Sequence, residues 1–450
     1  MSNVFTVKAC EDKNAKLVIH PETAEQIGLG RKKFAYACFG SHKYYTDIKM
    51  SSEVSEDSIL LSHKLMEELR IPDYPVYEVR VNGNEINIGP YIGLLASAKN
   101  SNLTEGRLNK MMTYVREYSR VHGAIVVFAL DRVDTANRLV EGYCFNPVKD
   151  CWQRGVFPYP SAIYRSIGLS EKWKNHFLSV IGDKMFNSRY FSKWEMYQWF
   201  SGDMGRYESH INIPYTQLYQ SYQDVLDLTE KFGKIYVKPV SGLQGRGVVR
   251  ISREDGAMVF QYREQGENYR IELKDPDEII DFITKRFYQG RYLIQQGIDL
   301  LRYRGRIIDF RCVVQKDQSG KWVCKAIIGR CGDRESVVSN ISSGGTAFPA
   351  VEILKRAMSS SEDEVLSMEE KIRDFAVRTC NTLDEYGINC GDLGVDVGID
   401  SQGNLWLIEI NNRDPDPTIA LNINDWKLYY SLKAGRLYYA KLLAGFGSLE

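Results

Sequence analysis

The sequence predicts a multidomain protein of mixed α+β and α/β class, in which a small β-rich unit and an α/β unit precede a longer mixed region. The chain has 450 residues, and at roughly 150 residues per domain this length corresponds to about three structural units. Short alternating strands fill residues 1–90, whereas strands alternate with helices after Gly89-Pro90. Apolar residues make up 44% of the chain and charged residues 26%, which is typical of a globular protein and excludes a disordered one.

The β-rich unit, residues 1–90, shows alternating strand patterns separated by turn residues such as Asn82-Gly83-Asn84. Two short helices are also expected there. The second begins after Ser62, a good N-cap residue, and ends before Pro72. The expected strands include 16–20, 34–39 and 76–81, and the expected helices are 21–28 and 62–70.

Residues 91–185 are expected to form the α/β unit. A strand at 91–95, a long polar helix near 105–122 and an apolar strand at 124–130 follow one another, which indicates a parallel sheet. The unit ends with the turn Pro158-Tyr159-Pro160 and a helix at 173–181.

Residues 186–450 mix helices with hairpins. The periodic pattern predicts helices at 193–200, 276–288 and 362–386, and two hairpins that turn near 242–247 and 401–404.

The charge and cysteine content exclude several classes of protein. Lys+Arg and Asp+Glu both number 58, so a polybasic nucleic-acid binder is disfavoured. The nine cysteines are scattered without a CxxC pair and the six histidines never cluster, which favours reduced thiols in the cytoplasm and leaves a structural zinc site without ligands. The longest strongly apolar stretch, 124–130, is far shorter than the roughly 18 residues of a membrane span, and the N-terminus does not resemble a signal peptide.

The hairpin at 395–411 carries the strongest chemical signal. If its turn is centred between Gln402 and Gly403, Asp396 lies directly opposite Glu409. Because side chains along a strand repeat every two residues, Asn411 shares the face of Glu409. Two carboxylates and an amide oxygen are therefore expected to converge.

Opposed like charges destabilise a sheet unless a cation lies between them, and oxygen ligands of this kind suit Mg²⁺ better than zinc or iron. The sequence therefore predicts a metal site at Asp396, Glu409 and Asn411. The alternative is a solvent-facing hairpin whose acids are hydrated.

A second motif is a strand that ends at Lys238 and runs into a glycine-rich loop containing Gln244, Gly245 and Gly247. Closely spaced glycines let backbone amides cradle phosphate oxygens, and Lys238 would act as a point charge on the same phosphates. The loop follows neither the Walker A nor the Rossmann pattern, so a glycine-rich turn without a ligand stays an equal alternative.

Three further pieces follow along the chain. The segment 292–298 is an apolar strand that ends in exposed polar residues. An ordinary buried strand without a ligand would show the same pattern. The next strand, 307–314, places Asp309 and Arg311 on one face, either as part of a site or as an internal ion pair or solvated face. Arg330 and the loop 339–346, with Asn340, supply donors for anionic oxygens.

The order of these pieces over roughly 220 residues resembles the ATP-grasp superfamily. The resemblance implies a lid at about 230–295 and a metal-bearing lobe at about 296–450. It also implies that the nucleotide is contacted by Lys193, Lys238, Asp309 and the segment Gln295, Gln296 to Ile298. The phosphates of the nucleotide would be contacted by a loop that contains Gln244, Gly245 and Gly247. Arg311, Arg330 and Asn340 resemble the catalytic residues that contact the transferred phosphoryl group, and Asp396, Glu409 and Asn411 resemble the metal ligands.

A closer resemblance over nearly the full length is to the YheC/YheD family of endospore coat-associated ATP-grasp proteins. The segments that carry it are 88–95, 127–128, 141–143, 152, 157–160 and 393–411.

This resemblance implies an enzyme that uses ATP and Mg²⁺, with two metal ions and Mn²⁺ as a substitute. It would activate a carboxylate as an acyl-phosphate and join it to an amine, with peptide or spore-coat and cell-envelope material as substrate and a location in the cytoplasm or the spore. Two alternatives stay open at this point. One is a coat-associated assembly protein that binds nucleotide without ligase activity, and the other is a kinase with the same ATP site.

Overall fold

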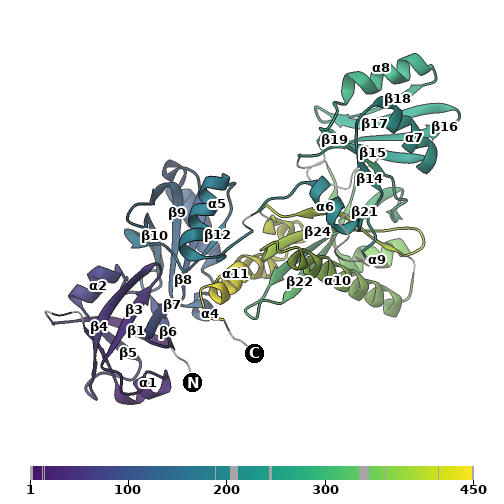
Figure 1. The fold of residues 1–450 in the computed structure, drawn as a ribbon. Coiled ribbons are helices and arrows are strands. Elements are labelled where there is room, and N and C mark those ends of the chain that lie inside the picture. The colour runs from purple at the N-terminus through teal and green to yellow at the C-terminus, as the bar shows by residue number, and fades with distance from the viewer. Residues whose placement is uncertain are drawn as a thin grey trace.

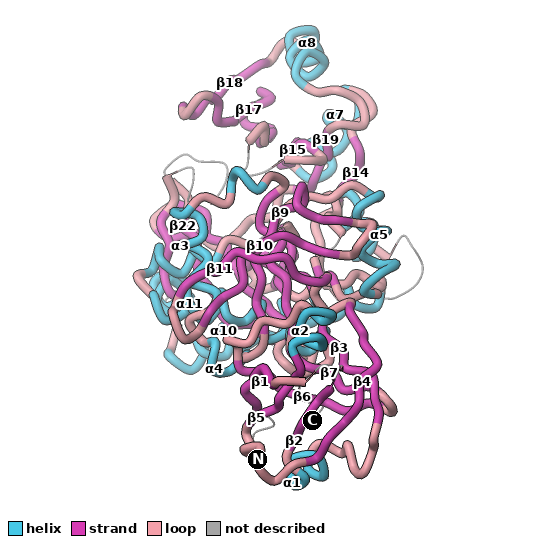
Figure 2. The backbone as a smooth tube through the Cα atoms, turned by 90° about the vertical axis from the view of Figure 1, so that its left-hand side faces the viewer, coloured by secondary structure: helices cyan, strands magenta, loops and turns pink. Residues whose placement is uncertain are grey.

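The computed structural model contains a closed barrel and three six-stranded sheets, with helices packed on the sheets (Figure 1). It describes residues 4–12, 14, 16–187, 189–202, 211–242, 246–333, 344–358, 360–413 and 415–447. In both views the barrel and the sheet formed by β14–β19 lie at opposite ends of the molecule (Figures 1 and 2). The mixture of helices and sheets is that of the predicted α+β and α/β class.

Residues 4–89 form the closed barrel, in the strand order β1-β5-β2-β4-β3-β7-β6. Ser62 accepts a hydrogen bond from the backbone N–H of Leu65 and so caps the second helix, as its sequence predicts. The barrel elements are β1 (Val4–Cys10), β2 (Lys16–Ile19), α1 (Pro21–Gln26), β3 (Phe34–Phe39), β4 (His42–Met50), β5 (Ser58–Ser62), α2 (His63–Leu69), β6 (Val76–Asn82) and β7 (Glu85–Gly89).

The next sheet has the order β11-β10-β9-β8-β12-β13. β8, β9, β12 and β13 are parallel, but β9, β10 and β11 pair antiparallel, so the sheet is mixed rather than fully parallel as expected. The expected long helix near 105–122 is broken into short pieces. The elements are β8 (Tyr91–Ser97), α3 (Glu105–Met111), α4 (Tyr118–Val121), β9 (Ala124–Asp134), β10 (Leu139–Asn146), β11 (Cys151–Pro158), β12 (Ala162–Arg165), α5 (Glu171–Ile181) and β13 (Met185–Phe186), with 3₁₀ turns at Asn100–Asn102 and Met112–Tyr114.

The third sheet, called here the glycine-loop sheet, has the order β14-β19-β15-β16-β17-β18 and a core of its own under α7 and α8. The glycine-rich segment after Lys238 joins β15 to β16 as an antiparallel hairpin. The elements are α6 (Lys193–Phe200), which precedes the sheet, β14 (Thr216–Leu218), α7 (Tyr222–Phe232), β15 (Lys234–Pro239), β16 (Val249–Glu254), β17 (Ala257–Glu264), β18 (Glu267–Leu273), α8 (Pro276–Arg286) and β19 (Tyr292–Gln296).

The fourth sheet, called here the carboxylate sheet, has the order β23-β22-β21-β24-β25, with β20 paired to β21. Alternate residues of β21 and β24 point into the core beneath α9 and α10, which leaves the other face for polar groups and α11. The elements are β20 (Arg302–Tyr303), β21 (Arg306–Lys316), β22 (Trp322–Cys331), β23 (Thr346–Pro349), α9 (Ala350–Met358), α10 (Glu362–Glu385), β24 (Asp392–Ile399), β25 (Leu405–Asn411), a 3₁₀ helix (Pro417–Ile423) and α11 (Trp426–Leu443).

Helix α11 joins two of the sheets. Leu437 and Ala440 pack against the β8–β13 sheet, whereas Leu432 packs against Val313 and Ile328 of the carboxylate sheet. A buried ion pair between Arg436 and Asp392 fixes the helix at this junction. Among the described residues, no helix is both long and apolar enough to cross a membrane.

Candidate functional site

The hairpin β24–β25 brings the expected carboxylates together. Asp396 pairs directly with Glu409, which confirms the predicted register at this position. Nearer the turn, Val397 pairs with Leu407, whereas a regular ladder from the predicted turn would pair Val397 with Ile408. The predicted turn centre is therefore wrong, and Ile408 is an extra residue in a β-bulge that restores the expected pairing.

This bulge decides which side chains reach the site. In a regular strand Leu405, Leu407 and Glu409 would share one face. The extra residue shifts the alternation of side chains between the two faces of the strand. As a result Leu407 and Ile410 lie in the core, while Glu409 lies opposite Asp396. The bulge differs from the regular hairpin that the sequence predicts. The three-residue spacing between core residues Leu407 and Ile410 was the signal that could have shown it.

Asp396 is buried and surrounded by hydrogen-bond donors. Arg311 holds it through a fork of two bonds, one from Nε to Oδ1 and one of 3.1 Å from Nη2 to Oδ2. Arg330 Nη2 lies 3.0 Å from Asp396 Oδ2, and Asn411 Nδ2 donates to the same oxygen across 3.3 Å. Burial alone would raise the pKa of Asp396, but the two guanidinium groups outweigh it and hold this pKa below the ordinary value.

Arg330 also holds a second carboxylate. Its Nε and Nη2 donate to the two oxygens of Asp309 across 2.7 and 2.6 Å, and the two residues are partners in the β21–β22 ladder. Asp309 and Arg311 share a face of β21, as predicted, but each pairs with a residue on a neighbouring strand rather than with the other. Burial opposes the charge of Arg330, but its two carboxylate partners raise its pKa.

Glu409 is the accessible acid of the site, with 32% of its side chain exposed, compared with 7% for Asp396. Its Oε1 lies 3.1 Å from Nζ of Lys193, at the start of α6. The same ammonium donates to the backbone carbonyl of Gly242 across 3.1 Å, so Lys193 joins the hairpin to the beginning of the glycine-rich loop.

Lys238, at the end of β15, faces the same place from the glycine-loop sheet. Burial lowers its pKa to about 8, an effect that Glu409 and Asp396 oppose and that the charge of Lys193 strengthens. The glycine-loop sheet and the carboxylate sheet therefore bring opposite charges to a common site.

The segment 295–298 lies on the same sheet as Lys238. Gln295 Nε2 donates to Thr216 Oγ1 across 3.0 Å, and Gln296 exchanges hydrogen bonds with the backbone of Tyr215. The backbone N–H of Gly297 donates to Lys234. The backbone donors of Gln296 and Gly297 are therefore occupied within the protein, and the carbonyl of Ile298 accepts a hydrogen bond from the backbone N–H of Leu300.

Three of the predicted site residues, Gln244, Gly245 and Asn340, lie outside the described residues. Gly247 is described and has a φ of +74°, a conformation that side chains other than glycine rarely adopt. A Cβ atom at this position would also approach the ring of Pro239 to 3.1 Å, so the turn after the loop depends on glycine.

The residues at the hairpin fit a magnesium ion. Asp396 and Glu409 lie opposite one another, and Asn411 adds an amide oxygen, so the donor set consists of the hard oxygen atoms that Mg²⁺ prefers. Because Asn411 directs its nitrogen to Asp396, its oxygen points away from that carboxylate. Glu409 offers the most accessible oxygens, whereas Asp396 is already neutralised by arginines.

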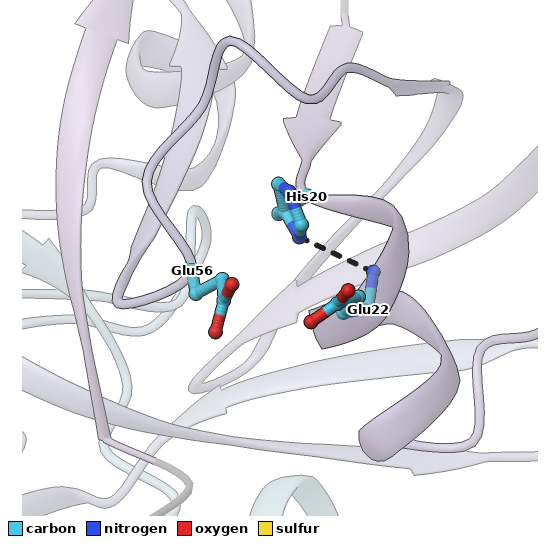
Figure 3. A group of neighbouring side chains, drawn as sticks. All are labelled: His20, Glu22 and Glu56. Atoms are coloured by element: carbon cyan, nitrogen blue, oxygen red, sulfur yellow. Dashed lines mark hydrogen bonds between the residues drawn. The ribbon is translucent and has the colours of Figure 1, made fainter.

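A separate group of possible metal ligands lies in the barrel, where His20, Glu22 and Glu56 place ligand atoms within 4.8 Å of one another (Figure 3). The imidazole of His20 caps α1, because its Nδ1 accepts a hydrogen bond from the backbone N–H of Glu22 across 3.3 Å. A neutral ring that accepts at Nδ1 carries its proton on Nε2, so neither nitrogen keeps a lone pair for an ion. The cluster is explained as a helix cap with two exposed acids.

Comparison with known proteins identifies the family. The model of the YheC/D-like ATP-grasp family matches residues 182–443, more than half of the chain. Endospore coat-associated protein YheD of Bacillus subtilis (strain 168) is 23% identical over 407 residues, which cover 87% of this chain and 86% of YheD. Endospore coat-associated protein YheC of the same organism is 23% identical over 207 residues, which cover 45% of this chain and 54% of YheC.

Among solved structures, the ATP-grasp ligase PsnB in complex with a minimal precursor is similar, with a TM-score of 0.41 and 14% identity, over 77% of this chain and 99% of PsnB. The family match spans Lys193, Lys238, Asp396 and Glu409, the charged residues that two sheets bring together. The chain belongs to the YheC/D-like ATP-grasp family.

Proposed function

We propose that this protein is an ATP- and Mg²⁺-dependent ligase that joins a carboxylate to an amine through an acyl-phosphate. The observation that carries this proposal is the charge arrangement at the meeting of the two sheets. Lys193 contacts both Glu409 and the start of the glycine-rich loop, and the charges of Glu409 and Asp396 act on Lys238 from the opposite sheet. A site in which two lysines lie close to carboxylate oxygens suits a nucleoside triphosphate with its metal.

Each described residue has a proposed role that follows from its position. Lys193 and Lys238 hold the phosphates as point charges, and the backbone of Ile298 meets the purine edge, beside Gln295 and Gln296. Asp309 orients Arg330 through its two-bond fork. Arg311 and Arg330 neutralise the charge that grows on the transferred phosphoryl group. The loop residues Gln244, Gly245 and Gly247 and the side chain of Asn340 are proposed as further phosphate contacts.

Asp396, Glu409 and Asn411 would hold the magnesium. When bound, the ion would neutralise charge on the phosphates of the nucleotide. The protein's own task is to position the reactants. Lys193 supports this role because it contacts both Glu409 and the carbonyl of Gly242, and so links the carboxylate hairpin to the glycine-rich loop.

The proposed reaction has two steps. A carboxylate oxygen of the substrate attacks the γ-phosphorus, the bond to the ADP oxygen breaks, and an acyl-phosphate forms. The amine nitrogen then attacks the acyl carbon, inorganic phosphate leaves with the electrons of the C–O bond, and the nitrogen loses a proton to water. Arg330 remains ionised throughout because its two carboxylate partners raise its pKa.

The names of YheD and YheC connect those two proteins with the endospore coat. We extend this connection to the present chain and propose that its substrate is peptide or cell-envelope material that becomes part of the spore. A location in the cytoplasm of the cell that forms the spore is consistent with nine free cysteines.

A screen for ADP and phosphate release over amino acids, peptides and acidic polymers, followed by mass spectrometry of the product, tests the function. A ligase gives ADP, phosphate and an amide in equal amounts. A phosphorylated product without free phosphate would instead show a kinase. Binding of MgATP without turnover over the whole panel would favour an assembly protein. Glu409→Gln is the control that separates turnover at this site from a contaminating ATPase.

A further inference from the structure

Arg165 is a buried cation whose charge is not balanced by a described carboxylate. It ends β12 and is 0% exposed, and among the described residues its side chain makes one hydrogen bond, 2.5 Å from Nη1 to the carbonyl of Ile167. Its Nε and Nη2 are buried and, among the described residues, have no hydrogen-bond partner. Leaving part of an ionised group unsatisfied in the interior destabilises the folded protein, so this arrangement calls for an explanation.

The side of the Arg165 guanidinium that carries Nε and Nη2 has a specific geometry. Nε and Nη2 are the two nitrogens whose N–H bonds point in parallel, and they match the two oxygens of a carboxylate. The same two nitrogens of Arg330 hold the carboxylate of Asp309, and the same two of Arg311 hold that of Asp396. Arg165 therefore has free the same edge of the guanidinium that Arg311 and Arg330 present to acids of the chain.

A second positive charge lies near Arg165. The guanidinium of Arg165 lies 4.0 Å from the centre of the Tyr190 ring, and that of Arg413 lies 5.5 Å from the same centre. Burial lowers the pKa of Arg165, and the charge of Arg413 lowers it further. An anion placed between the two groups would relieve both effects.

This pair of arginines adjoins the proposed active site. Arg413 follows Asn411 by two residues, a separation of about 7 Å in an extended chain. Asn412 Nδ2 donates to the carbonyl of Phe191 across 3.0 Å, which fixes Tyr190 beside the end of β25. Lys193, the contact of Glu409, lies three residues after Tyr190. Short stretches of chain therefore join the two places.

The topology of the sheet points to the same position. From β8 the chain continues to β9 on one side, whereas β12 and β13 lie on the other, and all four strands are parallel. In open α/β sheets ligands bind beyond the carboxyl ends of strands where the order reverses in this way. Arg165 occupies the carboxyl end of β12 at this point.

From these observations we infer that Arg165 and Arg413 bind a carboxylate of the substrate that is not the one activated by ATP. The substrate class is thus a molecule with an additional carboxylate, such as a free amino acid or the C-terminus of a peptide. This inference rests on the proposed ligase function. Tyr190 covers Arg165 and also lines a cavity of about 540 Å³, whose charged lining residues are Glu171, Lys174, Asp183, Arg189 and Glu195. Because Tyr190 lies in the irregular connection between β13 and α6, its ring can move aside without breaking a strand or helix.

Thermal unfolding of the full chain without nucleotide tests this site, with glutarate as the probe and inorganic phosphate and potassium chloride at equal ionic strength as comparisons. For the wild-type chain we expect glutarate to raise the unfolding midpoint by about 3–5 °C at saturation. Arg165→Met should abolish the shift, and Arg165→Lys should keep only part of it because lysine lacks the two-nitrogen fork. An unchanged shift in Arg165→Met, or a shift with phosphate and none with glutarate, would overturn the inference.

Stability separates a ligand site from a structural arginine, and Arg436 supplies the matched control. Arg436 is equally buried, at 1% exposure, but it is paired with Asp392, Tyr114 and the carbonyl of Pro415. Arg436→Met should lower the unfolding midpoint by at least about 5 °C. Arg165→Met should leave it unchanged or raise it, because it removes an uncompensated buried charge. A loss of stability in Arg165→Met as large as that in Arg436→Met would show a structural role and overturn the inference.

A parallel titration with MgATP distinguishes failure of this inference from failure of the proposed function. If MgATP stabilises every Arg165 variant and glutarate stabilises none of the proteins, the nucleotide site stands and the carboxylate site is wrong. If glutarate acts through Arg165 and MgATP has no effect, the carboxylate site stands and the ligase proposal is wrong.

Discussion

Arg330 Nη2 lies 3.0 Å from Asp396 Oδ2 while the same guanidinium holds both oxygens of Asp309. Arg311 holds Asp396 from the other side. The result is a buried row of alternating charges across β22, β21 and β24 in which each carboxylate has a guanidinium partner. Such a row is stable only as a whole, because removal of one member leaves its neighbours buried and unpaired.

Asp396→Asn should therefore lower the free energy of unfolding by about 3–5 kcal/mol at pH 7, because it leaves Arg311 without its carboxylate partner and Arg330 with Asp309 alone. Guanidinium denaturation measures this change. The low pKa of Asp396 sets its pH dependence. Its contribution is present above the ordinary pKa of 3.8 and is lost as the pH falls through the lower value of the folded protein. An Asp396→Asn variant as stable as the wild type would contradict the charge row.

Glu409→Gln should behave differently although Glu409 faces Asp396 in the same hairpin. Its side chain is about one-third exposed and pairs with the flexible Lys193, so we expect a change in unfolding free energy of at most about 1 kcal/mol. Turnover of ATP should nevertheless fall by at least about 10²-fold, because an oxygen ligand of the metal is lost. A folded variant with wild-type turnover would remove Glu409 from the metal site.

The stability of the protein should rise between about pH 8 and pH 10.5 because of Lys238. Burial lowers the pKa of Lys238 to about 8, compared with an ordinary value of 10.5. Between these values the unfolded chain binds a proton that the folded chain has released, so stability increases with pH. The full gain corresponds to about 3 kcal/mol. Denaturation curves at pH 7.5 and pH 10 compare the wild type with Lys238→Met, in which this gain should be absent. An equal gain in the variant would assign it to another group.

Much of the candidate site could be predicted from sequence because its signals are local. The β24–β25 hairpin fixed the pairing of Asp396 with Glu409, and Ser192 and Glu195 form a capping box that starts α6 at Lys193. The partners of these acids could not be predicted. Arg311 and Arg330 reach Asp396 only through the order of the strands in the sheet, which depends on long-range packing.

Two expectations differ from the structure. The expected helix near 105–122 is divided into α3, a 3₁₀ turn at Met112–Tyr114 and the short helix α4. The antiparallel strands β10 and β11 extend a sheet that the alternation of strands and helices suggested would be parallel. Arg165 could not be recognised as a buried cation at all, since burial is a property of the assembled fold.

Magnesium should bind this site only weakly until a nucleotide is present. At pH 7 the cluster contains Lys193, Lys238, Arg311 and Arg330 and the carboxylates of Asp309, Asp396 and Glu409, so its formal charge is positive. A divalent cation that arrives alone is repelled, whereas polyphosphate neutralises the lysines and then supplies oxygen ligands of its own.

Calorimetric titration with Mg²⁺ alone should give no saturable heat up to about 1 mM, whereas the same titration in the presence of ADP should saturate. Lys238→Met removes one positive charge from the cluster and should weaken the binding of ADP. It should not make ADP binding depend more strongly on Mg²⁺. Saturable magnesium binding below 1 mM without nucleotide would show that Asp396 and Glu409 are already free for the metal and that the arginines do not control its entry.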